Sequence, residues 1–227
     1  MSSLVHKLGL SSDLSWHDVF SLDDPSLLAF VPRPAHALLL VFPVSRSYEK
    51  MRADEDSELP EYTGVGTGEE VLWFKQTIGN ACGLMGLLHA VCNGMTRDLI
   101  APSTPLSNLI TEAIPLPPPD RAKLLEKSPD LASAHASAAA EGNTAAPSAD
   151  DRVDLHFVAF IKSAENNLWE LDGRRKGPLN RGKIPADEDV LGETAVALGP
   201  KEFLEREKET PGGELRFSIL ALGPSFG

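Results

Sequence analysis

The pattern of hydrophobic and polar positions predicts a chain in which helices come first and strands dominate later. The run 37–42 is apolar on both faces, which is typical of a buried strand. Further strands are predicted at 71–75, 155–162, 168–171 and 215–222. Helices are predicted at 4–8, 24–30, 46–61, 79–91, 106–113, 121–127 and 187–209, the last with a break at Gly199-Pro200. This order indicates an α+β fold.

A long segment in the middle of the chain lacks the composition of a core element. From 128 to 149 the chain is poor in large apolar side chains, rich in Ala and Ser, and contains Gly142 and Pro147. Such a composition predicts a flexible loop. No unit of about 20 to 50 residues repeats, which argues against a solenoid. We therefore expect one domain spanning residues 1–227.

Charge and cysteine content narrow the class of protein. The 33 acidic residues outnumber the 21 basic ones and give a net charge of −12. This balance argues against nucleic-acid binding and against an anionic membrane surface, and it favours a basic partner. Two cysteines cannot form a disulfide scaffold, so we expect a reducing compartment, the cytoplasm. The first residues, 1–14, lack the continuous apolar segment typical of a signal peptide, so we expect none, and the longest apolar run, 37–42, is too short to cross a membrane.

Some patterns resemble functional motifs only weakly. The glycines of 64–68 lack the Lys-Ser/Thr ending of a phosphate loop and precede a predicted strand, whereas a phosphate loop follows one. The prolines of 115–119 connect two predicted helices. Several histidines share no metal-ligand spacing with one another or with Cys92, namely His6, His17, His36, His89 and His135. We expect no metal site, and we expect Cys92 to be a small buried side chain.

Cys82 stands in a different setting. It lies at the very start of the helix that follows the predicted strand 71–75, where free backbone N–H groups and the positive end of the helix dipole favour a thiolate. Its neighbours Ala81 and Gly83 are small and leave room for a substrate carbonyl. A catalytic thiol needs an imidazole as its base, and the imidazole needs a group that orients it.

Candidate partners for this thiol occur at the ends of other predicted elements. His156 lies near the start of the strand 155–162, and Asp172 ends the strand that follows. Because a short turn joins these antiparallel strands, both side chains are expected near the same end of the sheet. Gln76 precedes Cys82 by six residues and is placed to donate its amide to an oxyanion. Each residue alone is more often structural, but the four together indicate a cysteine hydrolase.

Five separated segments carry a resemblance to one family. Residues 76–91 are similar to its nucleophile segment, and the segments around His156 and Asp172 are similar to its histidine and aspartate segments, in the same order. Residues 31–34 and 214–217 also match. The family is that of the ubiquitin carboxyl-terminal hydrolases, which are papain-like cysteine proteases. The similarity covers nearly all of the chain and is closest to the small, single-domain members.

The resemblance implies a papain-like fold, with a central antiparallel sheet flanked by helices and a knotted backbone. It implies that Cys82 is the nucleophile, His156 the general base and acid, and Asp172 the residue that orients the imidazole. The amide of Gln76 and the backbone N–H of Cys82 would form the oxyanion hole. Such an enzyme hydrolyses esters, thioesters and amides at the C-terminal glycine of ubiquitin, and it uses no cofactor or metal.

The resemblance also implies where the substrate binds. A crossover loop at about 140–152 is expected to span the active site. The residues expected to contact ubiquitin are Ala140, Glu141, Gly142, Asn143, Glu214, Arg216 and Phe217. The 13 residues of 140–152 make an arc of roughly 44 Å, which encloses an opening about 14 Å across. A helix about 10–12 Å wide can pass through this opening. A folded domain of about 100 residues, with a radius of gyration of about 13 Å, cannot. We expect release of peptides, small adducts and unfolded extensions, and poor cleavage between folded ubiquitins.

The expected partner is ubiquitin or a ubiquitin-like modifier, whose basic tail suits the net charge of −12, and we expect a monomer. Two other functions use the same residues. A binding module would sequester ubiquitin without cleaving it, and a turnover assay separates this function from hydrolysis. A papain-like enzyme with the same triad can also transfer the acyl group to an amine, which product analysis with an added amine would reveal.

Overall fold

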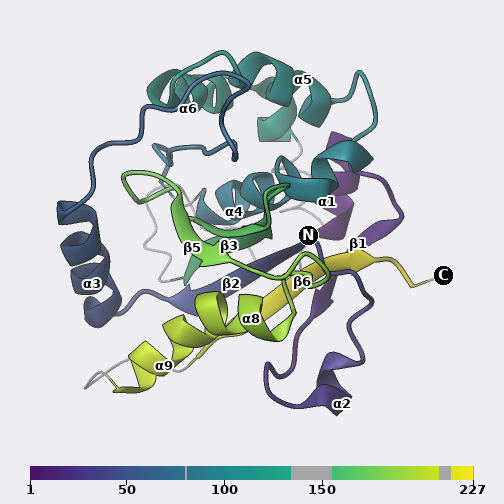
Figure 1. Cartoon of the computed structure of the whole chain (residues 1–227). Coiled ribbons are helices and arrows are strands. Elements are labelled where there is room, and N and C mark those ends of the chain that lie inside the picture. Colours follow the sequence, from purple (N-terminus) through teal and green to yellow (C-terminus); the bar gives the residue numbers. More distant parts are fainter. Residues whose placement is uncertain (80, 134–154, 210–215, 227) are drawn as a thin grey trace.

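The computed structural model describes residues 1–79, 81–133, 155–209 and 216–226. At its centre lies a six-stranded sheet in the order β1-β6-β2-β3-β4-β5 (Figure 1). All neighbouring strands are antiparallel. The strands are β1 (Leu14–Asp18), β2 (Ala37–Pro43), β3 (Leu155–Lys162), β4 (Asn167–Leu171), β5 (Leu179–Lys183) and β6 (Ser218–Pro224).

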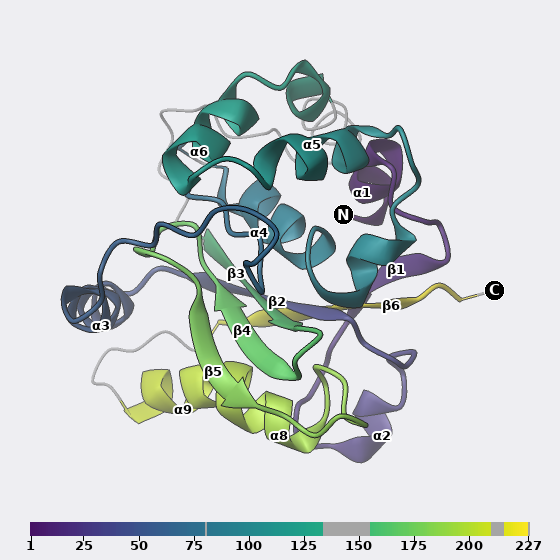
Figure 2. The same cartoon turned by 45° about the horizontal axis from the view of Figure 1, so that its top comes forward.

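Helices cover both faces of this sheet. They are α1 (Ser2–Leu8), α2 (Pro25–Leu28), α3 (Arg46–Ser57), α4 (Cys82–Val91), η1 (Gly94–Leu99), α5 (Pro105–Ala113), α6 (Pro118–Glu126), α8 (Glu193–Val196), η2 (Ala197–Lys201) and α9 (Glu202–Glu209). Helices α1, α4, α5 and α6 lie on one side, and α8 and α9 lie on the other (Figures 1 and 2). The central sheet is therefore enclosed between two helical layers.

Two hydrophobic cores follow from the alternation of side chains along the central strands. Leu39 of β2 and Ile161 of β3 point toward α4, whereas Leu40 and Phe160 point toward α8 and α9. Because the central strands are buried on both faces, they are continuous apolar runs in the sequence. These runs made β2 and β3 predictable.

The predicted α+β class and the central antiparallel sheet are confirmed, and the helices α3, α4, α5 and α6 lie within four residues of their predicted bounds. The helical region 193–209 contains a π turn, η2, at the predicted break, with Pro200 inside it. Residues 187–192 were predicted to be helical, but they form turns and loop. The knotted backbone stays a prediction, because 134–154 lies outside the described residues.

The prediction of a strand at 71–75 was wrong, since this buried segment joins no sheet. Its backbone groups bond to the side chains of His89 and Asn93, where a strand would bond to the backbone of a neighbouring strand. The N–H of Leu72 donates to Asn93 Oδ1 at 2.6 Å, and Asn93 Nδ2 donates to the carbonyl of Leu72 at 3.0 Å. The N–H of Phe74 donates to Nε2 of His89 at 3.0 Å. Burial lowers the pKa of His89 to about 4, so this ring stays neutral and able to accept.

The edge strands β1 and β5 were not predicted. In β5 no residue is fully buried, and its sequence, Leu-Asn-Arg-Gly-Lys, has no apolar alternation. In β1 the apolar positions are interrupted by Ser15 and His17. An edge strand pairs on one side only and carries polar residues that discourage further pairing, so its pattern is weak.

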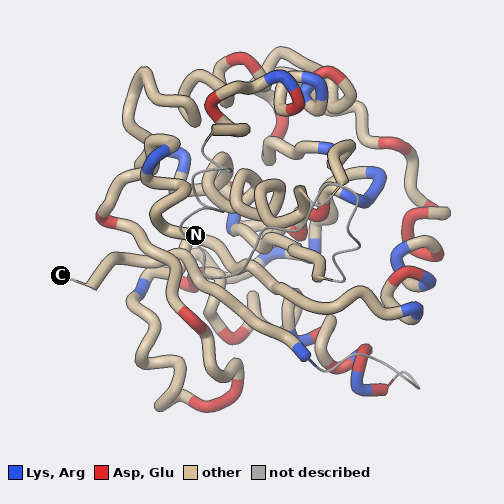
Figure 3. Tube along the Cα trace, turned by 180° about the vertical axis from the view of Figure 1, so that it is seen from behind, with Lys and Arg blue, Asp and Glu red and all other residues tan. Residues whose placement is uncertain are grey.

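Charged residues lie mainly on the outer helices and loops, and acidic and basic positions are intermixed (Figure 3). Helix α3 carries both kinds in quick succession along its 12 residues. Among the described residues, none of the helices combines the length and the apolar character that a membrane span requires.

Candidate active site

Cys82 is the first residue of α4, and its side chain reaches the start of β3. The helix approaches the sheet closely because Gly86 lacks a side chain there. A Cβ at Gly86 would lie 3.0 Å from Cδ2 of Leu39 and 3.1 Å from Cβ of Phe157. This approach lets the Cys82 thiol donate to the carbonyl of Leu155, with 3.4 Å between Sγ and oxygen. The thiol thus lies beside the residue that precedes His156.

His156 and Asp172 meet because β3 and β4 form one hairpin. Ala159 is paired with Leu171, so continuing the register places Asp172 opposite Val158 and diagonal to His156 on the same face. Diagonal side chains on neighbouring strands come within reach of one another. His156 Nε2 donates to Asp172 Oδ1 at 2.8 Å. The sequence-based expectation that both lie at one end of the sheet is confirmed.

The electrostatics of this pair favour a charged imidazole. Burial lowers the pKa of His156, but the charge of Asp172, its hydrogen bond and the Cys82 thiol outweigh burial and raise that pKa to about 9. Burial raises the pKa of Asp172, whereas His156, the Tyr48 hydroxyl and the Arg174 N–H lower it more strongly. Asp172 is therefore a buried carboxylate. Since Nε2 of His156 is bound to Asp172, Nδ1 is the ring nitrogen left for the thiol.

Tyr48 of α3 is part of this site, and sequence reasoning missed it. Its hydroxyl donates to Asp172 Oδ2 at 2.5 Å across 124 residues of sequence. One signal was present: in the charged sequence of α3, Tyr48 and Met51 are the large apolar residues and stand three apart, on one face. That spacing predicts a buried stripe, but not the group that the hydroxyl would meet.

Gln76 lies beside the turn that carries Asp172. The N–H of Gln76 donates to the carbonyl of Gly173 at 2.8 Å, and a Cβ on Gly173 would stand 3.0 Å from Cβ of Gln76. The side-chain Nε2 donates to the carbonyl of Ile78 at 3.1 Å. Because an amide nitrogen carries two hydrogens, one remains for another acceptor. Oε1 of Gln76 is buried and has no partner among the described residues.

The expected ubiquitin contacts fall into two groups. Ala140, Glu141, Gly142, Asn143 and Glu214 lie outside the described residues. Arg216 is exposed just before β6. Phe217 is half-buried and belongs to an aromatic cluster, with ring centroids 6.2 Å from Phe42 and 5.8 Å from Phe203. These contacts give Phe217 a packing role, and its contact with ubiquitin stays a prediction.

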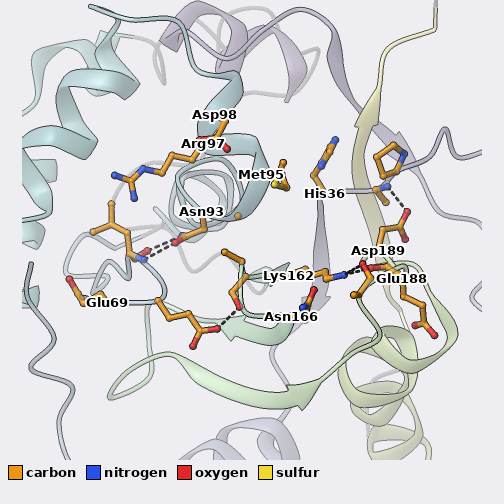
Figure 4. A pocket seen from close by; sticks show the side chains of 18 of the residues that line it. His36, Glu69, Asn93, Met95, Arg97, Asp98, Lys162, Asn166, Glu188 and Asp189 are labelled. Atoms are coloured by element: carbon orange, nitrogen blue, oxygen red, sulfur yellow. Dashed lines mark hydrogen bonds between the residues drawn. The ribbon is translucent and has the colours of Figure 1, made fainter. Parts of the chain in front are cut away.

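A cavity of about 1200 Å³ lies away from these residues, at the far end of β3 (Figure 4). Six residues separate His156 from Lys162, which lines the cavity, and this spacing corresponds to about 20 Å along a strand. Lys162 donates to three carbonyls, those of Pro185, Ala186 and Glu188. The Lys162 ammonium thus ties the loop 185–188 to the sheet. None of the predicted site residues lines this cavity.

Within the described ranges, no group of three His, Cys, Asp or Glu side chains is arranged to hold a metal.

Comparison with known proteins identifies the family. The sequence profile described as Ubiquitin carboxyl-terminal hydrolase, family 1, matches residues 1–201. Ubiquitin carboxyl-terminal hydrolase isozyme L1 of Rattus norvegicus is 38% identical over 222 residues, which span 98% of this chain and 93% of the relative. The isozyme L1 proteins of Monodelphis domestica and Homo sapiens are each 37% identical with the same coverage. The chain belongs to the ubiquitin carboxyl-terminal hydrolase family.

Solved structures of the family agree with this fold. The catalytic domain of UCH37 from Trichinella spiralis, in a crystal structure with ubiquitin vinyl methyl ester, superimposes with a TM-score of 0.71. Its sequence is 22% identical, and the match covers 99% of this chain and 91% of that one. The predicted family is thus confirmed, and with it the class of cysteine-type hydrolases that act at the carboxyl terminus of ubiquitin.

Proposed function

We propose that Cys82, His156, Asp172 and Gln76 carry out hydrolysis at the C-terminal glycine of ubiquitin. The observation that supports this best is the buried His156, which donates to the Asp172 carboxylate at 2.8 Å, while the Cys82 thiol donates to the carbonyl of the preceding residue, Leu155, at 3.4 Å. Geometry of this kind activates a thiol and holds the imidazole in one orientation. Cys92, the second cysteine, is fully buried, and burial raises its pKa to about 12, which makes it an inert thiol.

The reaction begins from the ion pair in which His156 already holds the proton of the Cys82 thiol. The thiolate attacks the carbonyl carbon of the terminal glycine, and the oxyanion accepts hydrogen bonds from Gln76 Nε2 and from the backbone N–H of Cys82. That N–H has no acceptor within the helix, because it belongs to the first residue of α4. When the bond to the leaving group breaks, His156 gives its proton to the departing atom. Water then attacks the thioester, His156 takes a proton from it, and the ubiquitin carboxylate leaves.

A turnover assay tests this proposal. Purified protein is mixed with a fluorogenic amide or ester at the C-terminus of ubiquitin, and release of the fluorophore is followed. Cys82→Ala should abolish release while binding of free ubiquitin is retained, because a methyl group replaces a thiol that is only 7% exposed. Loss of binding together with activity would show that Cys82 is structural. Cys92→Ala is the matched control and should leave turnover unchanged.

Two alternative functions leave different products. A module that only holds ubiquitin binds it and releases no fluorophore even at high protein concentration. A transferase releases fluorophore and, with an added amine, yields ubiquitin joined to that amine. The buried, fully assembled His156–Asp172 pair favours turnover over mere binding, because a binding surface has no need of an oriented imidazole.

The crossover loop is also a proposal, resting on the family and on composition. It lies outside the described residues, at about 140–152. We expect that about ten Gly/Ser residues inserted after Gly142 widen its opening and raise cleavage of linked di-ubiquitin, with small-adduct hydrolysis little changed. Unchanged di-ubiquitin cleavage would show that the loop is not the gate.

We propose that the protein is cytoplasmic, because its two unpaired cysteines favour a reducing compartment. The distribution of a fluorescent fusion, compared with organelle markers, tests it. A fusion confined to an oxidising compartment would contradict the proposal.

A further inference from the structure

Asp172 has donors on both of its oxygens, and one of these donors lies outside the proposed catalytic set. Oδ1 accepts from Nε2 of His156 and from the backbone N–H of Arg174, each at 2.8 Å. Oδ2 accepts from the Tyr48 hydroxyl at 2.5 Å, which is within the range of O–H bonds to carboxylates. Among the described residues, Tyr48 is the donor recorded for Oδ2 of this fully buried side chain.

The plane of an aspartate carboxylate is not fixed by its rotamer. Its last torsion joins an sp³ carbon to an sp² carbon and has broad, roughly two-fold minima. Hydrogen bonds must therefore set the plane of Asp172. Without the Tyr48 hydroxyl, Oδ2 would be a buried acceptor without a donor among the described residues, a costly arrangement that rotation of the carboxylate would relieve. That rotation would move Oδ1 away from His156.

Tyr48 is itself firmly held. Its backbone N–H donates to Oγ of Ser45 at 2.9 Å, which caps the start of α3. Its ring is 1% exposed and lies 4.8 Å from the ring of Phe42 and 5.6 Å from that of Phe203, measured between centroids. The hydroxyl therefore has a defined position before any substrate arrives.

Ion pairs dock helix α3 to β4 and to the turn that follows it, which contains Asp172. Arg175, whose side chain is 1% exposed, pairs with Glu55 at 2.6 Å and with Asp56 at 3.2 Å, both on α3. The same guanidinium lies 3.3 Å from Glu170 of β4. One buried cation thus joins the helix that carries Tyr48 to β4, the strand directly before Asp172.

We propose that Tyr48 is a positioning residue for hydrolysis: its hydroxyl fixes the plane of the Asp172 carboxylate and thereby the orientation of the His156 imidazole toward Cys82. The inference rests on the proposed function of these three residues. Burial and the charge of Asp172 raise the pKa of Tyr48 well above its ordinary value, so the hydroxyl remains a donor throughout the working pH range. The simpler explanation is that a core tyrosine has merely found an acceptor, and the experiment must separate the two.

Tyr48→Phe removes the hydroxyl and keeps the ring. The chain has a second tyrosine, Tyr62, whose hydroxyl donates to Oε1 of Glu69 at 2.8 Å, so Tyr62→Phe removes the same kind of bond away from His156. We expect Tyr48→Phe to lower kcat by about tenfold or more, as for loss of a bond to a charged group, with KM changed less than about twofold. Tyr62→Phe should leave kcat unchanged. Equal kcat in the two variants would overturn the proposal.

A double-mutant cycle shows whether Tyr48 acts through Asp172. On an Asp172→Ala background there is no carboxylate to orient, so adding Tyr48→Phe should lower kcat no further. A tenfold loss on that background as well would assign Tyr48 a purely structural role.

If Tyr48→Phe does not fold, two unnatural residues at position 48 provide the test instead, 4-methylphenylalanine and 4-aminophenylalanine. Their side chains are similar in size, and only the second carries a hydrogen-bond donor. Restored kcat with the amino group alone supports the proposal, and equal kcat with both contradicts it.

A spectroscopic readout is independent of turnover. The proton on Nε2 of His156, bound to a carboxylate, should give a downfield NMR resonance that is lost or broadened in Tyr48→Phe and retained in Tyr62→Phe. An unchanged resonance in Tyr48→Phe would overturn the positioning role. If the wild-type protein fails to hydrolyse ubiquitin derivatives, the proposed function fails, and this resonance still decides the role of Tyr48.

Discussion

Asp172→Asn replaces a carboxylate by an amide of nearly the same size where it faces His156. The hydrogen bonds can survive the change. Oδ1 still accepts from His156 and from the N–H of Arg174, and the new Nδ2 can donate to the oxygen of Tyr48. The variant is therefore expected to fold, and the main loss is that of one negative charge.

The size of the effect follows from the pKa of His156. Burial lowers this pKa, and the charge of Asp172 is the largest influence that raises it, to about 9. Without that charge the pKa should fall to the ordinary value of 6.5 or below. A fall from about 9 to 6.5 corresponds to about 3 kcal/mol less stabilisation of the imidazolium, or roughly 10²-fold. We expect kcat/KM at neutral pH to fall by at least that order.

The assay is hydrolysis of a fluorogenic ubiquitin C-terminal amide, measured from about pH 5 to about pH 10. In the wild type, activity should decline as pH rises through about 9, where His156 loses its proton. In Asp172→Asn this decline should begin below about pH 7. Near-UV circular dichroism and thermal melting check that the variant is folded. Wild-type kcat/KM with an unmoved alkaline limb would refute the idea that Asp172 holds the imidazolium.

Three further perturbations test other parts of the site. Gln76→Ala should lower kcat on the order of 10²–10³-fold through loss of an oxyanion donor. The melting temperature should change little, because the hydrogen bond lost from Nε2 to the carbonyl of Ile78 is exposed and Oε1 has no partner among the described residues. An unchanged kcat would remove Gln76 from the mechanism. Gly173→Ala places a Cβ 3.1 Å from the carbonyl oxygen of Phe74 and 3.1 Å from the backbone nitrogen of Gln76. It should therefore displace Gln76 and lower kcat by about tenfold or more. Full activity would show that the turn tolerates the methyl group. The pKa of His156 is about 9 in the folded chain, above its ordinary value of 6.5. His156 should therefore stabilise the fold fully below pH 6.5 and lose this contribution as pH rises through about 9. Urea unfolding across this pH range should show the loss of stability in the wild type and a much smaller loss in Asp172→Asn.

The sequence by itself determined the parts of the site that depend on local patterns. Cys82 begins α4 because the helical run of small and apolar residues 82–91 starts there. His156 and Asp172 come together because two apolar strands joined by a short turn have little choice of register. Secondary-structure periodicity and a tight connection are local properties, and they are legible without knowledge of the rest of the chain.

Tertiary structure decided what depends on distant partners. The segment 71–75 has the composition of a strand, yet two side chains, His89 of α4 and Asn93 just after it, satisfy its backbone in place of a neighbouring strand. The bond from Tyr48 to Asp172 crosses 124 residues of sequence, and no local pattern specifies which acceptor a buried hydroxyl will meet. A buried polar group must find a partner, but only the packing of α3 against β4 determines that this partner is the carboxylate that faces His156.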